Sequence, residues 1–180
     1  MKHLVKIVGL VGLLITLSDS YLAKQKDLLG WEAVRWGMSE KDILKVFGDK
    51  LKKLPKRMAF LRWHSDYVIP NYRLADEIFT VFFQMDDDTN KLSQVLTRLN
   101  EQKSQVPRIQ LYNRLELILA RKFGFPCTKL DNSSSDQSKN VQVIDLSCTW
   151  KFPTTNVELA YSWDNEIYAS LLTVSHSPAK

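Results

Sequence analysis

Residues 79–99 read FTVFFQMDDDTNKLSQVLTRL, and this stretch decides the fold that the sequence predicts. Every second residue of its first part is apolar: Phe79, Val81, Phe83 and Met85. A period of two is typical of a strand with one buried face. Residues 87–90 have the composition of a turn, and residues 92–99 continue as a second strand. The stretch therefore predicts an antiparallel hairpin.

Further strands are predicted on both sides of this hairpin. A less regular strand, residues 60–69, precedes it. Residues 144–152 and 157–163 alternate in the same way, after a polar loop at residues 130–140. A turn then leads to a closing strand at residues 167–174.

Two helices are predicted between these strands. The first begins at Ser39, an N-cap with Asp42 three residues later as a variant capping box, and it ends at Gly48. Met38 and Ile43 have the spacing of a hydrophobic staple around that cap. The second runs from Pro107 to Gly124, with apolar residues at three- and four-residue spacing.

The element order is helix, three strands, helix, three strands. Antiparallel hairpins with intervening helices predict an α+β fold, in which a two-layer antiparallel sheet has its helices on one face. One constant offset aligns Phe47-Gly48 with Phe123-Gly124 and Asp88 with Asp164. This favours two tandem helix-plus-hairpin units, residues 24–104 and 105–180. Alternatively, residues 31–176 form one continuous domain. The similarity of the two halves would then only reflect the alternation of helices and strands that any α+β chain shows.

The N-terminus has the order of a secretory signal peptide. Lysines precede an apolar run at residues 7–17, and small polar residues follow, so residues 1–23 are predicted to be the signal. An uncleaved anchor is the alternative, although the run is shorter than the roughly 20 residues a spanning helix needs. Cleavage lowers the formal net charge from +5 to +4, because two lysines and one aspartate leave. We expect a periplasmic or secreted protein.

The chain has two cysteines, Cys127 and Cys148. In an exported protein such a pair predicts a disulfide. Two buried free thiols are the alternative.

Three features together resemble a known class of domain. They are the glycine-led cap Trp36-Gly37-Met38-Ser39, the helix through Ile43 that ends at Phe47-Gly48, and a strand ending in Phe83-Gln84-Met85-Asp86. The chain resembles exported bacterial domains of the SmpA/OmlA (BamE) lipoprotein type and of the β-lactamase inhibitor protein type. It departs from the lipoproteins by lacking the lipidated cysteine. The resemblance implies a protein-binding role without catalysis and does not name the partner.

Signals for catalysis or metal binding are weak. His64 and Asp66 would share a strand face, which allows a hydrolase dyad, but a surface histidine is the preferred interpretation. His176, four residues from the end, is expected to fray. Residues 86–97 begin like a calcium loop but lack its glycine and its final glutamate. We therefore predict no enzyme, no cofactor and no metal site.

A basic cluster offers a candidate binding surface. Its cations are Lys50, Lys52, Lys53, Lys56 and Arg57. Trp63, beside Arg62 and His64, is the expected exposed anchor. The alternatives are that the cations belong to a solvent-exposed segment without a binding role and that Trp63 is a core residue. We expect the partner to be another envelope or extracellular protein, with contact to a membrane surface as a second hypothesis and no nucleic acid.

Overall fold

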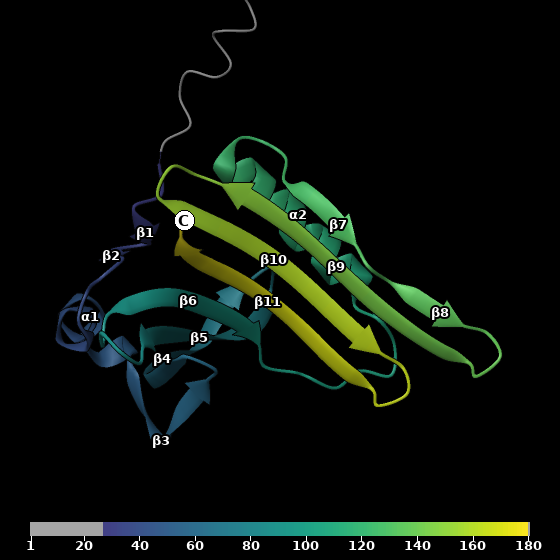
Figure 1. The fold of residues 1–180 in the computed structure, drawn as a ribbon, viewed down its shortest axis with the longest axis horizontal. Coiled ribbons are helices and arrows are strands. Elements are labelled where there is room, and N and C mark those ends of the chain that lie inside the picture. Colours follow the sequence, from purple (N-terminus) through teal and green to yellow (C-terminus); the bar gives the residue numbers. More distant parts are fainter. Residues whose placement is uncertain (1–26, 180) are drawn as a thin grey trace, which may run out of the picture.

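One antiparallel sheet dominates the structure, a computed structural model that describes residues 27–179. The signal peptide predicted for residues 1–23 lies outside the described residues. Eight strands pair in the order β3-β4-β5-β6-β11-β10-β9-β7, and a ninth, β8, pairs with β9 (Figure 1). Two further short strands, β1 (Gly30–Trp31) and β2 (Val34–Arg35), pair only with each other.

The first half of the sheet has β3 (Lys52–Phe60), β4 (Trp63–Leu74), β5 (Glu77–Asp86) and β6 (Leu92–Leu99). The second half has β7 (Thr128–Asp131), β8 (Ser134–Asp136), β9 (Val141–Lys151), β10 (Thr155–Asp164) and β11 (Ala169–Pro178). Two helices, α1 (Glu40–Phe47) and α2 (Ile109–Phe123), and a 3-10 turn, η1 (Gly48–Lys50), complete the described elements.

The predicted fold class is wrong. The chain is mostly β, with one nine-stranded sheet and two short helices, and is not a two-layer α+β domain with helices covering one face. Its two halves do not form separate sheets, because β6 pairs with β11 from Val95↔His176 to Arg98↔Thr173. Each half also has more than the three predicted strands. β3 is rich in lysine, and β7 and β8 lie in polar sequence, so none has the apolar alternation that marks a strand.

The hairpin of residues 79–99 forms as predicted, and its register runs from Phe79↔Leu99 to Met85↔Leu92. The predicted single strand over residues 60–69 is instead the end of β3, a turn at Leu61-Arg62 and the start of β4. The last strand, β11, continues past His176, so the predicted fraying is wrong.

The start of α1 is confirmed in detail. Ser39 is the N-cap, its hydroxyl accepts from the Asp42 N–H, and the Asp42 carboxylate accepts from the Ser39 N–H, which completes the capping box. Helix α2 begins at Ile109, two residues after Pro107, and ends at Gly124 with a left-handed φ of 82°.

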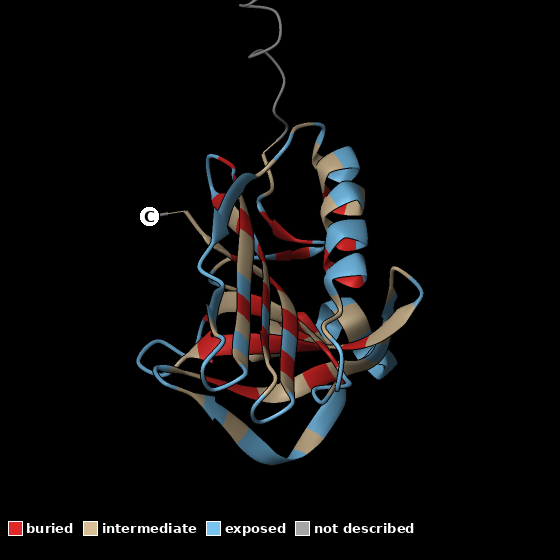
Figure 2. Ribbon diagram, turned by 90° about the vertical axis from the view of Figure 1, so that its right-hand side faces the viewer, coloured by how far each residue is buried: buried red, intermediate tan, exposed pale blue. Residues whose placement is uncertain are grey.

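Two apolar clusters form the core. One surrounds α2 and includes Trp150 and Trp163, which are both buried. The other lies between α1 and β5, with Ile43, Phe83 and Met85 among its members. Figure 2 shows buried residues alternating with exposed ones along the strands, and one exposed side of α2.

The segment before α1 connects the two halves. Trp31 packs against Phe47 and Phe83 of the first half. Trp36 donates from Nε1 to Thr155 Oγ1 at 2.9 Å, and that hydroxyl in turn donates to the Leu28 carbonyl. The N-terminal segment is therefore bound to the start of β10.

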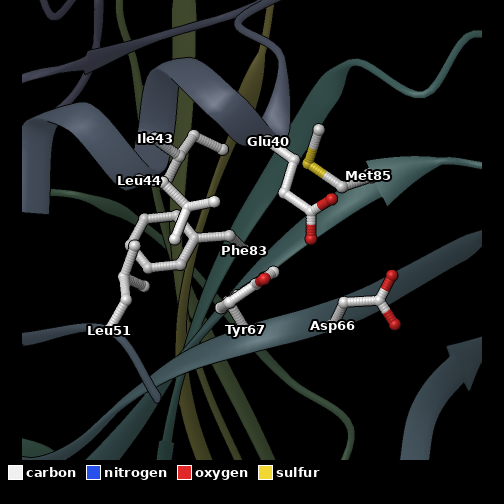
Figure 3. Close-up of a pocket in the computed structure, with 8 residues that line it drawn as sticks. All are labelled: Glu40, Ile43, Leu44, Leu51, Asp66, Tyr67, Phe83 and Met85. Atoms are coloured by element: carbon white, nitrogen blue, oxygen red, sulfur yellow. The ribbon is translucent and has the colours of Figure 1, made fainter. Parts of the chain in front are cut away.

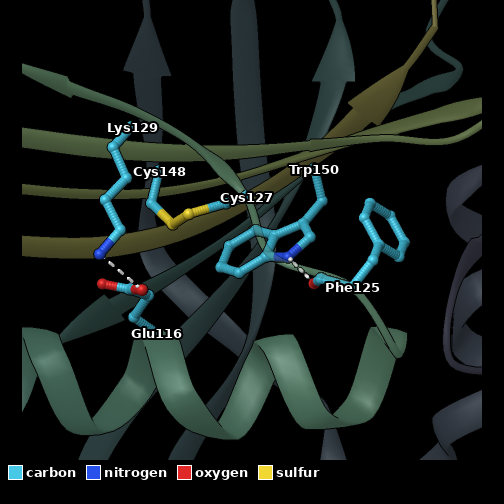
Figure 4. The surroundings of a disulfide bond; sticks show 6 residues. All are labelled: Glu116, Phe125, Cys127, Lys129, Cys148 and Trp150. Atoms are coloured by element: carbon cyan, nitrogen blue, oxygen red, sulfur yellow. Dashed lines mark hydrogen bonds and ion pairs between the residues drawn. A yellow bond between two sulfur atoms is a disulfide. The ribbon is translucent and has the colours of Figure 1, made fainter.

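Cys127 and Cys148 form the predicted disulfide, with their Cα atoms 5.4 Å apart (Figure 4). Cys148 on β9 is fully buried. Beside the bond, Lys129 and Glu116 form an ion pair of 2.8 Å, and the Trp150 indole donates to the Phe125 carbonyl at 3.1 Å. The disulfide therefore fixes the segment after α2 to the sheet.

Replacing both cysteines (Cys127→Ala and Cys148→Ala) should lower the free energy of unfolding by about 3 kcal/mol, because the bond closes a loop across a sequence separation of 21 residues. Urea unfolding monitored by circular dichroism measures the loss. Reductant should destabilise the wild type and leave the double variant unchanged; equal sensitivity of both proteins would contradict this role.

His176 should make the protein sensitive to mild acid. Burial lowers its pKa from 6.5 to about 3, and its Nδ1 has no hydrogen-bond partner among the described residues. Between these values the unfolded state binds the proton and the folded state does not. Stability is therefore complete above pH 6.5 and falls as the pH drops towards 3, by up to about 1.4 kcal/mol per pH unit.

The measurement is the urea midpoint between about pH 7.5 and pH 5.5, above the range where most ordinary carboxylates titrate. His176→Gln should flatten this part of the profile. A variant profile as steep as the wild type would assign the acid sensitivity to other groups.

Candidate binding surface

The strand β3 is the edge of the sheet and is bent in its middle. Lys52 and Lys53 pair with β4, and pairing resumes only at Met58, so the register shifts between them. Pro55 lies in this interval and has no N–H to donate to a neighbouring strand. Figure 1 shows β3 as a bent strand at the margin of the first half.

One ion pair holds the bend against β4. The Arg57 guanidinium donates to both carboxylate oxygens of Asp66, at 3.0 and 2.6 Å. These hydrogen bonds, above all, lower the pKa of Asp66 and raise that of Arg57. We call residues 50–61 the basic arm: they include Lys50, Lys52, Lys53, Lys56 and Arg57 and no carboxylate.

The arm ends in an exposed turn. Leu61 has a left-handed φ of 46° and a side chain that is 104% exposed. The next carbonyl, that of Arg62, accepts a hydrogen bond from the Asp87 N–H at 3.1 Å, which fixes the turn to the loop between β5 and β6. The Leu61 side chain therefore points into solvent from an anchored backbone.

An aromatic cluster lies on the strands next to the turn. Phe60 of β3 is paired with Trp63 of β4, and Trp63 is paired with Asp86 of β5, so the three side chains lie on one face of the sheet. Phe82 lies on the same face, because it precedes Asp86 by four residues on β5 and side chains alternate along a strand. The rings of Phe60 and Phe82 are 5.9 Å apart. This face is opposite the one that carries Phe83 and Met85 into the core under α1.

Two arginines stack on this cluster. The Arg62 guanidinium is 4.9 Å from the Trp63 ring, and the Arg98 guanidinium is 4.7 Å from the Phe82 ring. Burial lowers the pKa of Arg98, and neither arginine has an ion pair with a carboxylate within residues 27–179. We call Phe60, Arg62, Trp63, Phe82 and Arg98 the aromatic face.

Two buried polar atoms on this side of the sheet have no hydrogen-bond partner among residues 27–179. They are Nε1 of Trp63, a donor, and Oε1 of Gln84, an acceptor. Gln84 lies between Phe82 and Asp86 on β5, and its side chain is only 2% exposed. Unpaired buried groups are costly, so these two favour a further hydrogen-bond partner at the aromatic face.

The structure divides the predicted surface residues among three places. Arg62 and Trp63 lie together on the aromatic face, and Lys52, Lys53, Lys56 and Arg57 lie along the basic arm. His64 belongs to neither: it is 4% exposed, so the predicted surface histidine is wrong. Its Nδ1 lies 2.6 Å from Asp87 Oδ1.

The geometry does not produce the dyad that His64 and Asp66 suggested. The pairing of β4 with β5 is irregular between His64 and Val68, so simple strand alternation does not apply to Asp66. Each residue has a different partner, Asp87 for His64 and Arg57 for Asp66.

The acidic turn after β5 is closed by its own hydrogen bonds. Asp86 Oδ1 accepts from both the N–H and the hydroxyl of Thr89, at 2.9 Å each. These bonds lower the pKa of Asp86. The turn therefore has the geometry of a hydrogen-bonded loop, as the failed calcium pattern suggested.

Two cavities lie among the described residues. A space of about 10 Å³ lies between α1 and the sheet, and Figure 3 shows its mostly apolar lining around Phe83, Leu44 and Met85. It has room for about one water molecule. An open groove of about 480 Å³ lies at the start of α2, lined in part by Arg108 and Arg114.

One potential metal-binding group lies among the described residues. It consists of Glu116, Cys127 and Cys148. Both sulfurs are joined in the disulfide, and the Glu116 carboxylate is paired with Lys129, so these atoms are already engaged.

Within residues 27–179, no helix has the length and apolarity required to cross a membrane.

The sequence does not predict three members of the aromatic face. The less regular strand at residues 60–69 gives Phe60 no definite face, and the alternation in residues 79–85 predicts that Phe82 faces solvent. Arg98 reaches Phe82 only through the register Phe82↔Leu96 and Thr80↔Arg98. Phe82, an apolar residue at a position expected to face solvent, is the one sequence signal that this strand has a second apolar face.

Comparisons with protein families, with curated proteins and with solved structures found no match for this chain. Its function must therefore be argued from the geometry described above.

Asp66→Asn should loosen the basic arm, because the neutral amide loses the charge-assisted pairing with Arg57. Trypsin cleavage after Lys56 and Arg57 should become about two- to fivefold faster, as expected for loss of a surface ion pair. Mass spectrometry of timed digests measures the sites. Cleavage after Lys139 serves as an internal control, and equal acceleration there would indicate a global effect instead.

Proposed function

We propose that the protein is a non-catalytic, exported binding domain that docks onto another protein through the aromatic face. The observation that carries this proposal is the pair of guanidinium groups, Arg62 and Arg98, each stacked on an aromatic ring. Neither has a carboxylate partner in an ion pair among the described residues.

Such a surface has the chemistry of a protein-binding hot spot. Tryptophan and arginine are enriched where alanine substitution costs most at interfaces. Stacking already orders both guanidinium groups, so less side-chain entropy is lost when a partner binds. Their free donors suit a carboxylate or carbonyl group of the partner.

The export part of the proposal is supported by two observations. The disulfide is of the kind that persists in oxidising compartments, and the N-terminal sequence has the pattern of a signal peptide. We assign the domain to the periplasm or the extracellular space on this basis.

A hydrolase is the less favoured candidate. The dyad that would have supported it is not assembled, because His64 and Asp66 bond to different residues. The Ser65 hydroxyl donates to the Phe83 carbonyl at 2.8 Å, and its side chain is fully buried. None of these groups faces an open cavity as a nucleophile with its base.

Substituting both stacked arginines (Arg62→Ala and Arg98→Ala) should weaken partner binding by about tenfold or more, since hot-spot truncations each cost over about 1 kcal/mol. The immobilised protein is incubated with an envelope fraction of its host, and the enriched protein is identified and then titrated. The matched control is Arg73→Ala with Arg121→Ala, which removes two exposed arginines elsewhere.

The proposal requires an enriched protein whose affinity falls in the first variant and not in the control. If both double variants bind equally, the aromatic face is not the docking surface. If the wild type enriches nothing over an unrelated disulfide-containing domain, the protein-binding function itself is rejected.

A further inference from the structure

The basic arm concentrates the positive charge of the whole molecule. Residues 50–61 contain five cations and no carboxylate, and the full chain has a formal net charge of +5, so the remaining residues sum to zero. Without residues 1–23 the arm stays at +5 and the remainder becomes −1. The electrostatic attraction of this protein for an anionic partner is therefore localised on one edge of the sheet.

Four of the five charges are lysines that the fold leaves uncompensated. Lys50, Lys52, Lys53 and Lys56 are exposed and take part in no ion pair recorded for residues 27–179. Arg57 is the exception, because it is bound to Asp66. Internal pairing therefore stabilises the shape of the arm, and the lysines remain free to act on a surface outside the molecule.

The end of the arm adds an exposed apolar group. Leu61 gains no burial in the fold, and its positive φ is a conformation that leucine disfavours and asparagine tolerates. Neither packing nor backbone geometry accounts for leucine at this turn. An apolar side chain that projects from a cationic edge can enter the boundary between lipid headgroups and acyl chains.

The distribution of these groups fits a lipid surface better than a protein pocket. Lysine is a flexible point charge, whereas fixed carboxylates favour the planar fork of arginine. The nine residues of β3 can spread the charges over at most about 30 Å. The cavity under α1 includes Leu51 of the arm in its lining, but at about 10 Å³ it has room for only about one water molecule, and the larger groove lies at the start of α2.

We propose that the basic arm and Leu61 dock the domain onto an anionic membrane surface. The lysines supply a salt-dependent attraction to lipid phosphates, and Leu61 inserts below the headgroups. The contact is made by the lysines and Leu61 and not by Arg62 or Arg98, so these two guanidinium groups stay available to a protein at the same membrane. The inference therefore goes beyond the proposed function and can fail without it.

The test is co-sedimentation of the folded protein with phosphatidylcholine vesicles that contain either no anionic lipid or about 30% phosphatidylglycerol. We expect binding only to the anionic vesicles. It should be lost between about 0.05 M and about 0.5 M NaCl, because screening shortens the range of the attraction. Salt-insensitive binding, or equal binding to neutral vesicles, would overturn the proposal.

Charge reversal locates the contact. The variant Lys52→Glu, Lys53→Glu, Lys56→Glu should lower vesicle partitioning by at least about 100-fold. The control Lys103→Glu, Lys122→Glu, Lys139→Glu makes the same change of net charge at exposed positions of the other half. Equal losses in both variants would mean that only net charge matters and would reject the arm as the docking site.

Leu61→Asn separates insertion from folding. Asparagine tolerates the positive φ, so the urea midpoint should stay the same or rise, while partitioning should fall about five- to tenfold. Unchanged partitioning would remove Leu61 from the contact. If wild type ignores anionic vesicles but binds soluble polyglutamate through the same lysines, the arm recognises an acidic polypeptide and the membrane proposal is wrong.

Discussion

The pairing of β6 with β11 is the constraint on which the rest of the structure depends. Its register covers four residue pairs, from Val95↔His176 to Arg98↔Thr173, and it joins the halves into one sheet. On one side of this joint, Thr97 and Val174 are buried with the core. On the other side lies Arg98, whose guanidinium reaches back over Phe82. A shift by one residue would exchange these two sides and remove both the core and the aromatic face.

The charged edge and the aromatic cluster follow from different physical causes. The aromatic face forms because β5 carries apolar residues on both sides, so Phe82 must be covered by Phe60 and Arg98 on the side away from α1. The basic arm forms because Pro55 interrupts pairing at an edge strand, where lysine is compatible with solvent. Both proposed contact surfaces therefore lie on the same half of the sheet.

Local signals predicted the local structure well. Only a few neighbouring residues determine the cap at Ser39, the helix end at Gly124 and the hairpin of residues 79–99. The disulfide follows from the presence of two cysteines in a chain with the pattern of a signal peptide. The fold class was wrong because edge strands need no apolar pattern: Lys52–Phe60 and Thr128–Asp131 are strands through backbone pairing alone. The candidate site was found in part, since Arg62 and Trp63 are adjacent in sequence. Arg98 was not found, because its contact with Phe82 depends on register. His64 was misplaced because its pairing opposite the buried Met85 also depends on register.

The contacts of the N-terminal segment have a consequence for the order in which the chain can fold. Trp36 bonds to Thr155 across a separation of 119 residues, and Thr155 bonds to Leu28 across 127. During synthesis or export from the N-terminus, the segment that emerges first must wait for a binding site that emerges near the end. Loop closure over such distances is slow and contributes late. Trp31 can pack against Phe47 and Phe83 within the first half, but Trp36 stays incompletely fixed until β10 arrives, so this part of the chain completes its folding only when synthesis is nearly finished.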